Sequence, residues 1–129
     1  MMRKKRILVV EDDPLLSQTI DLCLTKKGHD VKVLYSGAEA VKHIFKEQAD
    51  SILLDVSLPD CDGWFVARML LNVDWAKEVP FIMMSVMEPD SSKLAEFQPY
   101  AYIQKPFDMG QLVAAVEGSL SGDLSPASG

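Results

Sequence analysis

The stretch ILVVEDDP, residues 7–14, decides the fold class of this chain. Its first four residues form a continuous apolar run, which is typical of a strand buried on both faces. Asp13 and Pro14 then predict the start of a helix, with Asp13 as the N-cap and Pro14 at the first helical position. A buried strand that leads directly into a helix is the first half of a βα unit, which indicates a parallel sheet.

The same alternation continues to residue 120. Four further short apolar runs predict strands at 31–35, 52–54, 81–85 and 101–105. Helical patterns fill the segments at 14–27, 36–45, 66–73, 92–97 and 108–120. Five strands alternating with five helices predict an α/β fold, a doubly wound parallel sheet with helices on both faces.

Apolar spacing also predicts which side chains of these helices face the core. We expect the second helix to face inward through Val41, Ile44 and Phe45. The pattern of the third helix extends to Val73. Between the last two strands, residues 92–97 leave room for a short helix only.

Charge limits the partners of this chain. Its 19 acidic and 13 basic residues give a formal net charge of −6. Four basic residues are adjacent at positions 3–6, so the rest of the chain is more acidic still. Such a surface repels phosphate backbones and anionic lipids. We therefore expect no direct nucleic-acid partner and no membrane partner.

The chain carries no recognisable export or membrane signal. The apolar run at 7–10 is shorter than the roughly 7–15 residues of a secretory signal, and no stretch approaches the roughly 20 apolar residues of a membrane span. Cys23 and Cys61 have no metal-ligand spacing and are interpreted as reduced thiols of a cytoplasmic protein. Length and composition predict one domain at 1–121, followed by a flexible tail or the start of a linker at 122–129.

Charged and polar side chains follow four of the five predicted strands. Ligands bind at the carboxyl ends of strands in open parallel sheets, so these residues are the candidate site. They are Glu11, Asp12, Asp55, Ser85 and Lys105. Two carboxylates about 5 Å apart repel by roughly 3 kcal/mol at an effective dielectric of 20. We therefore expect a compensating hard cation such as Mg²⁺, together with the ammonium of Lys105.

The same residues exclude the common nucleotide sites. The chain has no GxxxxGK[ST] loop, and no GxGxxG follows the first strand. Acidic residues at that position would repel a pyrophosphate. A phosphoryl group neutralised by a metal and a lysine is the anion that this edge tolerates.

Four motifs together resemble the receiver domain of bacterial two-component response regulators. They are ILVVEDDP at 7–14, ILLDVSLPDCDG at 52–63, the serine after FIMM at 85, and YIQKPF at 102–107. The resemblance extends from residue 4 to about residue 121. It implies a five-stranded flavodoxin-like sheet in the order 2-1-3-4-5.

The resemblance also implies roles for individual residues. The implied metal ligands are Glu11, Asp12, Asp55 and the backbone carbonyl of Ser57. The implied phosphoacceptor is Asp55, served by Lys105 and Ser85, and the implied switch residues are Ser85 and Tyr102. The bond between Lys105 and Pro106 matches the position of a cis peptide in this family.

By resemblance, the chain is a phosphorylation-dependent switch and not an enzyme acting on a separate substrate. It would take a phosphoryl group from a histidine kinase or a histidine phosphotransfer protein, with Mg²⁺ as cofactor. Phosphorylation would change the face formed by the fourth helix, fifth strand and fifth helix. That face would bind a downstream effector or a second copy of the chain in a homodimer.

Two departures keep a different function open. Only 20 residues separate Ser85 from Lys105, fewer than the resemblance leads us to expect, and the bulky Val86 follows the hydroxyl. Both features suit a binding module that no longer cycles phosphate. A phosphatase with an aspartate nucleophile fits less well, because such enzymes usually carry that nucleophile after the first strand.

Overall fold

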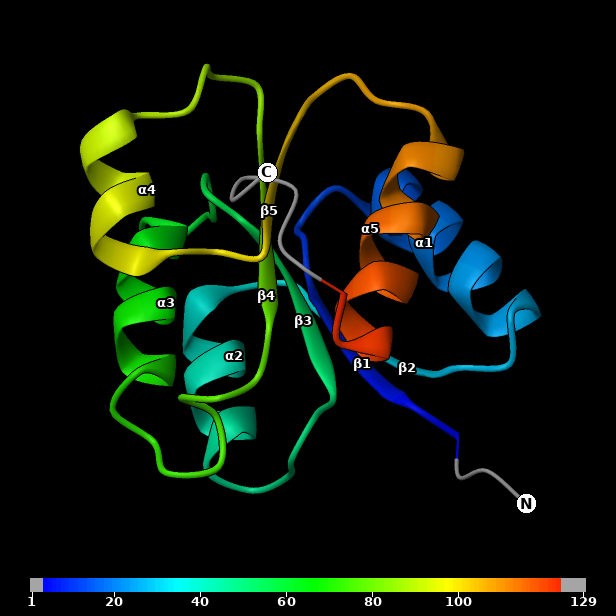
Figure 1. Ribbon diagram of the computed structural model, residues 1–129, viewed down its shortest axis with the longest axis horizontal. Coiled ribbons are helices and arrows are strands. Elements are labelled where there is room, and N and C mark those ends of the chain that lie inside the picture. The colour runs from blue at the N-terminus through cyan, green and yellow to red at the C-terminus, as the bar shows by residue number, and fades with distance from the viewer. Residues whose placement is uncertain (1–3, 124–129) are drawn as a thin grey trace.

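The polypeptide forms one open, five-stranded parallel sheet with helices on both faces (Figure 1). A computed structural model describes residues 4–123. The strands are β1 (Arg6–Val10), β2 (Asp30–Leu34), β3 (Ser51–Asp55), β4 (Phe81–Ser85) and β5 (Ala101–Gln104). Their order in the sheet is β2-β1-β3-β4-β5, which confirms the predicted doubly wound topology.

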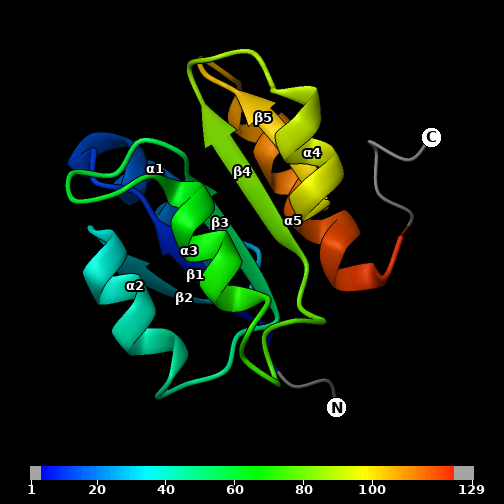
Figure 2. The ribbon, with the colours of Figure 1, turned by 90° about the vertical axis from the view of Figure 1, so that its left-hand side faces the viewer.

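Five helices cover the two faces of the sheet. They are α1 (Pro14–Lys26), α2 (Gly37–Ile44), α3 (Gly63–Leu70), α4 (Ser91–Phe97) and α5 (Met109–Ser121). Helices α1 and α5 lie on one face, whereas α2, α3 and α4 lie on the other (Figure 2). The loops that follow the strands therefore meet at one edge of the sheet.

The core consists of two apolar layers separated by the sheet. Successive side chains of a strand point to opposite faces. In β1, Leu8 and Val10 pack toward α2, α3 and α4, whereas Ile7 and Val9 pack toward α1 and α5. Both layers are buried, which explains why the central strands read as continuous apolar runs.

Each helix begins at an oxygen-bearing side chain that caps its first turn. The five N-cap residues are Asp13, Ser36, Asp62, Asp90 and Asp108. Each accepts a hydrogen bond from a backbone N–H of that turn, which fixes where the preceding loop ends. The predicted cap at Asp13 is confirmed.

One predicted core position and one predicted helix boundary are wrong. Helix α2 buries Ala40 and Ile44, which are four residues apart, while Phe45 lies just past its last residue and is 65% exposed. Helix α3 ends at Leu70, and Val73 belongs to the turns that follow. Val73 still packs against the core, which is why its spacing resembled a helical pattern.

The fourth helix is short, as predicted. Helix α4 has seven residues, and its C-cap Gln98 adopts a left-handed conformation with φ of 50°. Pro99 follows directly and restricts the backbone there. Strand β5 ends at Gln104, so Lys105 is the first residue of the next loop.

The last described element is helix α5. Helix α5 ends at Ser121, and Gly122 caps it with φ of 75°. Residues 124–129 of the predicted tail lie outside the described residues. Within residues 4–123, no helix has the length and apolar character needed to cross a bilayer.

Candidate functional site

Three carboxylates converge at the carboxyl edge of the sheet. Glu11 and Asp12 follow β1, Asp55 ends the neighbouring β3, and one oxygen of each lies within 4.8 Å of the others. Glu11 is 1% exposed and Asp55 is 3% exposed, whereas Asp12 is exposed. The structure thus brings together the predicted acidic cluster.

Lys105 crosses the sheet edge to reach this cluster. Its Nζ lies 2.7 Å from Glu11 Oε1 and 3.0 Å from Asp55 Oδ2. The bond between Lys105 and Pro106 is cis. A single ammonium group therefore contacts two carboxylates that are 44 residues apart in sequence.

Backbone amides hold the remaining oxygens of these two carboxylates. Glu11 Oε2 accepts a hydrogen bond of 3.0 Å from the Asp13 N–H. Asp55 Oδ1 accepts one of 3.1 Å from the Ser57 N–H. Both side chains are consequently fixed before any ligand binds, as pre-organised sites require.

Burial and charge act in opposite directions on the two central groups. Burial raises the pKa of Glu11 to about 7, although the hydrogen bond from Lys105 partly offsets this effect. Burial by itself would lower the pKa of Lys105, but its hydrogen bonds to Glu11 and Asp55 leave that pKa raised. Lys105 is therefore a fixed cation, and Glu11 is a carboxyl group that a further cation would help to ionise.

The donor set suits a hard divalent cation. Three carboxylates face one ammonium, so the cluster has an excess of negative charge when all are ionised. Carboxylate and carbonyl oxygens are the ligands that Mg²⁺ prefers. Ser57, whose carbonyl was predicted as a ligand, lies at the start of the β3–α3 loop beside Asp55. These residues fit the predicted metal.

Ser85 and Tyr102 both contact the loop between β4 and α4. Ser85 ends β4, and its Oγ accepts a hydrogen bond of 3.0 Å from the Met87 N–H. The Tyr102 hydroxyl donates a hydrogen bond of 2.8 Å to the Met87 carbonyl. Gln104 holds the Val86 carbonyl at 3.3 Å. Tyr102 is therefore bound to the backbone of this loop.

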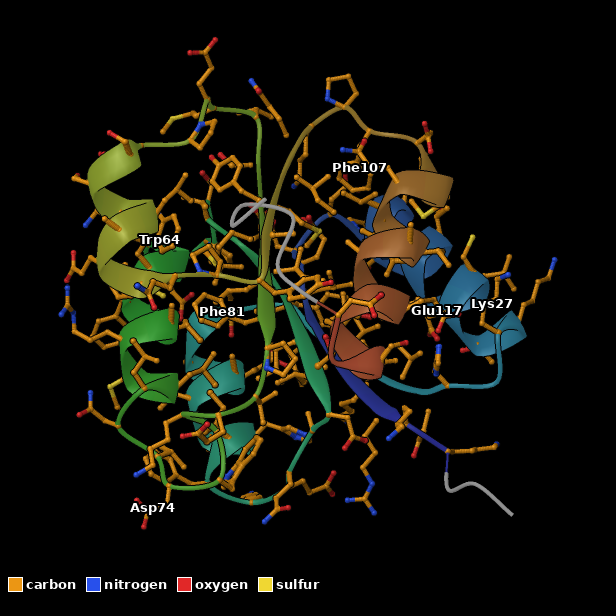
Figure 3. The ribbon with its side chains drawn as sticks, in the orientation of Figure 1. Lys27, Trp64, Asp74, Phe81, Phe107 and Glu117 are labelled. Atoms are coloured by element: carbon orange, nitrogen blue, oxygen red, sulfur yellow. The ribbon has the colours of Figure 1, made fainter. Side chains whose placement is uncertain are left out.

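An aromatic stack that the sequence analysis missed connects Tyr102 to α4. Trp64, which is labelled in Figure 3, lies in the first turn of α3. Its ring stacks on that of Phe97 of α4, with centroids 5.1 Å apart. The ring centroids of Trp64 and Tyr102 are 6.5 Å apart. Arg68 covers Phe97 at 5.0 Å and forms an ion pair of 2.8 Å with Glu96. A large aromatic residue two positions after a helix N-cap was the available signal.

The sequence analysis also missed Asp60, at the tip of the loop between β3 and α3. Its two carboxylate oxygens accept hydrogen bonds of 2.8 and 2.9 Å from the N–H groups of Gly37 and Ala38. The bond from Gly37, followed by that from Ala38, lowers the pKa of Asp60. No local pattern indicates a contact across more than 20 residues.

A shallow apolar hollow adjoins the acidic cluster. It has a volume of about 460 Å³ and lies between the start of α1 and the loop that follows β5. Its apolar lining consists of Leu15, Leu16, Val86, Pro106 and Phe107. Lys105 forms part of the wall, so the hollow opens next to the predicted site.

Known proteins share the fold of this chain. The model of the response regulator receiver domain family matches residues 7–117. The receiver domain of a sensor histidine kinase from Pseudomonas aeruginosa, solved with a magnesium ion in its active-site cleft, is 26% identical with a TM-score of 0.82, covering 92% of this chain and 99% of that chain.

Two further structures belong to the same comparison. The receiver domain of a signal transduction histidine kinase from Syntrophus aciditrophicus is 28% identical with a TM-score of 0.83, covering 92% of this chain and 91% of that chain. A chemotaxis response regulator from Vibrio cholerae is 21% identical with a TM-score of 0.85, covering 92% of this chain and 100% of that chain. At that identity, the last similarity concerns the fold alone.

Proposed function

This chain belongs to the response regulator receiver domain family, and on that premise we propose that it is a phosphorylation-dependent switch of a two-component system. The observation that carries the proposal is the position of Lys105 Nζ between Glu11 and Asp55, with Asp12 in the same cluster. A fixed cation beside a buried carboxylate is suited to receiving an anionic group.

We propose Asp55 as the phosphoacceptor. One of its carboxylate oxygens attacks the phosphorus of a phosphohistidine while the P–N bond breaks, and the released imidazole takes up a proton. The product is an acyl phosphate on Asp55. Lys105, already 3.0 Å from Asp55 Oδ2, would neutralise charge on the phosphoryl oxygens as the group arrives.

The proposed cofactor is Mg²⁺, held by Glu11, Asp12, Asp55 and the carbonyl of Ser57. Bound there, the ion would supply the positive charge that a transferring phosphoryl group requires. The chain's own contribution is to hold these oxygens in place, because backbone amides already fix Glu11 and Asp55.

Ser85 and Tyr102 are the proposed switch residues. The Ser85 Oγ accepts the Met87 N–H, so its own proton is available to a phosphoryl oxygen on Asp55. Movement of Ser85 toward that group would release the Met87 amide. Because the Tyr102 hydroxyl binds the Met87 carbonyl, the loop and the tyrosine would move together.

The proposed partners follow from this switch. A cytoplasmic histidine kinase or histidine phosphotransfer protein would supply the phosphoryl group. The face formed by α4, β5 and α5 would bind a downstream effector or a second copy of the chain. Tyr102 lies on β5 and changes with the loop before α4, which makes this face the one that responds.

A binding module that does not cycle phosphate is the second candidate. Its support is the seven-residue α4, which ends at the left-handed Gln98 before Pro99. A shorter α4 leaves less of the responding face to rearrange.

Phosphorylation with a small donor separates the two candidates. The protein is incubated with Mg²⁺ and acetyl phosphate, and the intact mass is measured. A gain of one phosphoryl group that is absent in Asp55→Asn supports the switch. Asp74→Asn, a fully exposed carboxylate on a turn, is the matched control and should label as the wild type does. If the wild-type mass is unchanged, the passive module replaces the switch.

A further inference from the structure

We propose that Asp60 is a positioning residue that sets the affinity of the acidic site for Mg²⁺. It would do so by fastening the loop between β3 and α3, which carries the Ser57 carbonyl, to the N-terminus of α2. The inference rests on the proposed metal site. Four features of the described residues support it.

Asp60 binds α2 although that helix already has a cap. The Asp60 carboxylate accepts the N–H groups of Gly37 and Ala38, at 2.8 and 2.9 Å. Ser36 Oγ accepts the next free N–H of the turn, from Glu39, at 3.2 Å. Ser36 therefore provides the local cap that helices commonly have. The hydrogen bonds of Asp60 additionally connect the loop between β3 and α3 to the first turn of α2.

The loop that carries Asp60 is braced internally. The Leu58 N–H donates to the Cys61 carbonyl at 3.2 Å, which closes the turn around Asp60. Ser57 and Asp62 form an antiparallel bridge across the base of that turn. A displacement of Asp60 would consequently shift Ser57, because the hydrogen bond and the bridge restrict the backbone between the two residues.

Glu11 of the acidic cluster is hydrogen-bonded to the junction between β2 and α2. The Glu11 N–H donates a hydrogen bond of 3.0 Å to the carbonyl of Leu34. Leu34 ends β2, only two residues before the α2 cap Ser36. The junction between β2 and α2 thus contacts Glu11 on one side and Asp60 on the other. Asp60 therefore completes a series of contacts that connects Glu11, through this junction, to the loop that carries the Ser57 carbonyl.

Gly37 shows how closely the loop approaches α2. A Cβ atom at Gly37 would overlap Cys61 Sγ and lie 3.3 Å from Asp60 Oδ1. Gly37 is the first residue of α2 and does not have a positive φ. A side chain is therefore excluded by the approach of the loop and not by the backbone conformation.

These contacts allow a test that separates position from charge. Asp60→Asn keeps the shape but replaces one acceptor oxygen with a donor that faces an N–H group. Gly37→Ala keeps the Asp60 charge and displaces the loop through Cys61. The double variant Gly37→Ala with Cys61→Ala removes the overlapping sulfur and should restore the loop. Ser36→Ala weakens α2 itself and leaves the hydrogen bonds of Asp60 intact, so it is the matched control.

Mg²⁺ is titrated into each ¹⁵N-labelled protein, and the dissociation constant is read from amide chemical shifts of residues 55–58. For Asp60→Asn and Gly37→Ala, we expect the constant to rise about three- to tenfold, less than the 10–100-fold typical of partners that touch a metal ligand directly. Ser36→Ala should lower the melting temperature and leave the constant within about twofold of wild type. The double variant should also return to within about twofold.

The outcomes distinguish this inference from the proposed function. If the wild type binds Mg²⁺ and both single variants bind it equally well, Asp60 does not position the site and only this inference fails. If Ser36→Ala weakens binding as much as Asp60→Asn, the effect belongs to α2 stability and the inference also fails. If the wild type does not respond to Mg²⁺, the proposed metal site fails and the inference fails with it.

Discussion

Lys105 and Glu11 form an ion pair in which Nζ and Oε1 are 2.7 Å apart, and the Glu11 side chain is almost completely buried. The two residues follow β5 and β1, strands that are separated by β3 and β4 in the sheet. Breaking a buried pair by removing one partner is costly, because the remaining charge loses its compensation. This pair therefore links the stability of the fold to the charge state of the site.

Replacement of Lys105 tests that link. We expect Lys105→Met to lower the free energy of unfolding by about 1–3 kcal/mol in the absence of Mg²⁺, less than for a fully buried pair because Lys105 is partly exposed. Mg²⁺ should stabilise the variant more than the wild type, because the ion would replace the missing charge. Urea melts with and without Mg²⁺ measure both effects. Lys77→Met, which breaks an exposed pair with Asp74 at 3.9 Å, should change stability by less than about 0.5 kcal/mol. Equal melts for the two variants would contradict the expectation.

The raised pKa of Glu11 predicts a pH dependence in the absence of metal. Its pKa is about 7 in the folded chain against an ordinary value of 4.5, so the folded state binds the proton more tightly. The stabilisation from this group is present below pH 4.5 and is lost as the pH rises to 7, by at most about 3 kcal/mol. Urea melts between pH 5 and 8 should show a smaller decline for Glu11→Gln than for wild type. Glu78→Gln, an exposed control, should follow the wild type, and equal slopes in all three proteins would refute the assignment.

Ser85→Ala should separate phosphorylation from its readout. The hydroxyl is not the nucleophile, so the variant should still gain one phosphoryl group from acetyl phosphate. Amide shifts of residues 86–104 should change on phosphorylation of the wild type and change much less in Ser85→Ala, since no hydroxyl is left to bind the phosphoryl oxygen. Ser92→Ala, in the first turn of α4, keeps Ser85 and should respond as the wild type does. Loss of labelling in Ser85→Ala would give Ser85 a different role.

Met87 is predicted to slow hydrolysis of the acyl phosphate. Its side chain is long and apolar, and it follows the serine by two residues, where it would shield the phosphorus from water. We expect Met87→Ala to lose the phosphoryl group several-fold faster than wild type, since about 1.4 kcal/mol of barrier corresponds to a tenfold rate. Decay is followed by intact mass after removal of the donor. In this structure Met87 is 59% exposed, so it would have to move over the site, and unchanged decay would show that it does not.

The position of the acidic site was predictable, because ligands of open parallel sheets bind at the carboxyl ends of the strands. Parallel strands bring their carboxyl ends to one edge, so Asp12, Asp55 and Lys105 had to be neighbours once the strands were recognised. The internal geometry was not predictable in the same way. Lys105 Nζ lies 2.7 Å from Glu11 and 3.0 Å from Asp55, and the order of the strands does not determine these side-chain distances.

The errors and omissions share one physical cause. Phe45 has the spacing of a core residue, but the helix ends before it, and tertiary packing decided the boundary. Asp60 contacts Gly37, 23 positions before it, and Trp64 of α3 contacts Phe97 of α4. Sequence periodicity reports which face of an element is buried, and it carries no information on which distant residue it meets.

The ring contacts of Trp64 with Phe97 and Tyr102 give the protein an intrinsic optical reporter. The chain has two tryptophans. The other, Trp75, lies in the turns between α3 and β4, away from the loop between β4 and α4, and donates its indole N–H to the Ile44 carbonyl. Emission from Trp64 depends on the rings beside it, so rotation of Tyr102 would change its quantum yield while Trp75 supplies a constant background. The time course of switching would then be recorded in unlabelled protein, from the light that one indole emits.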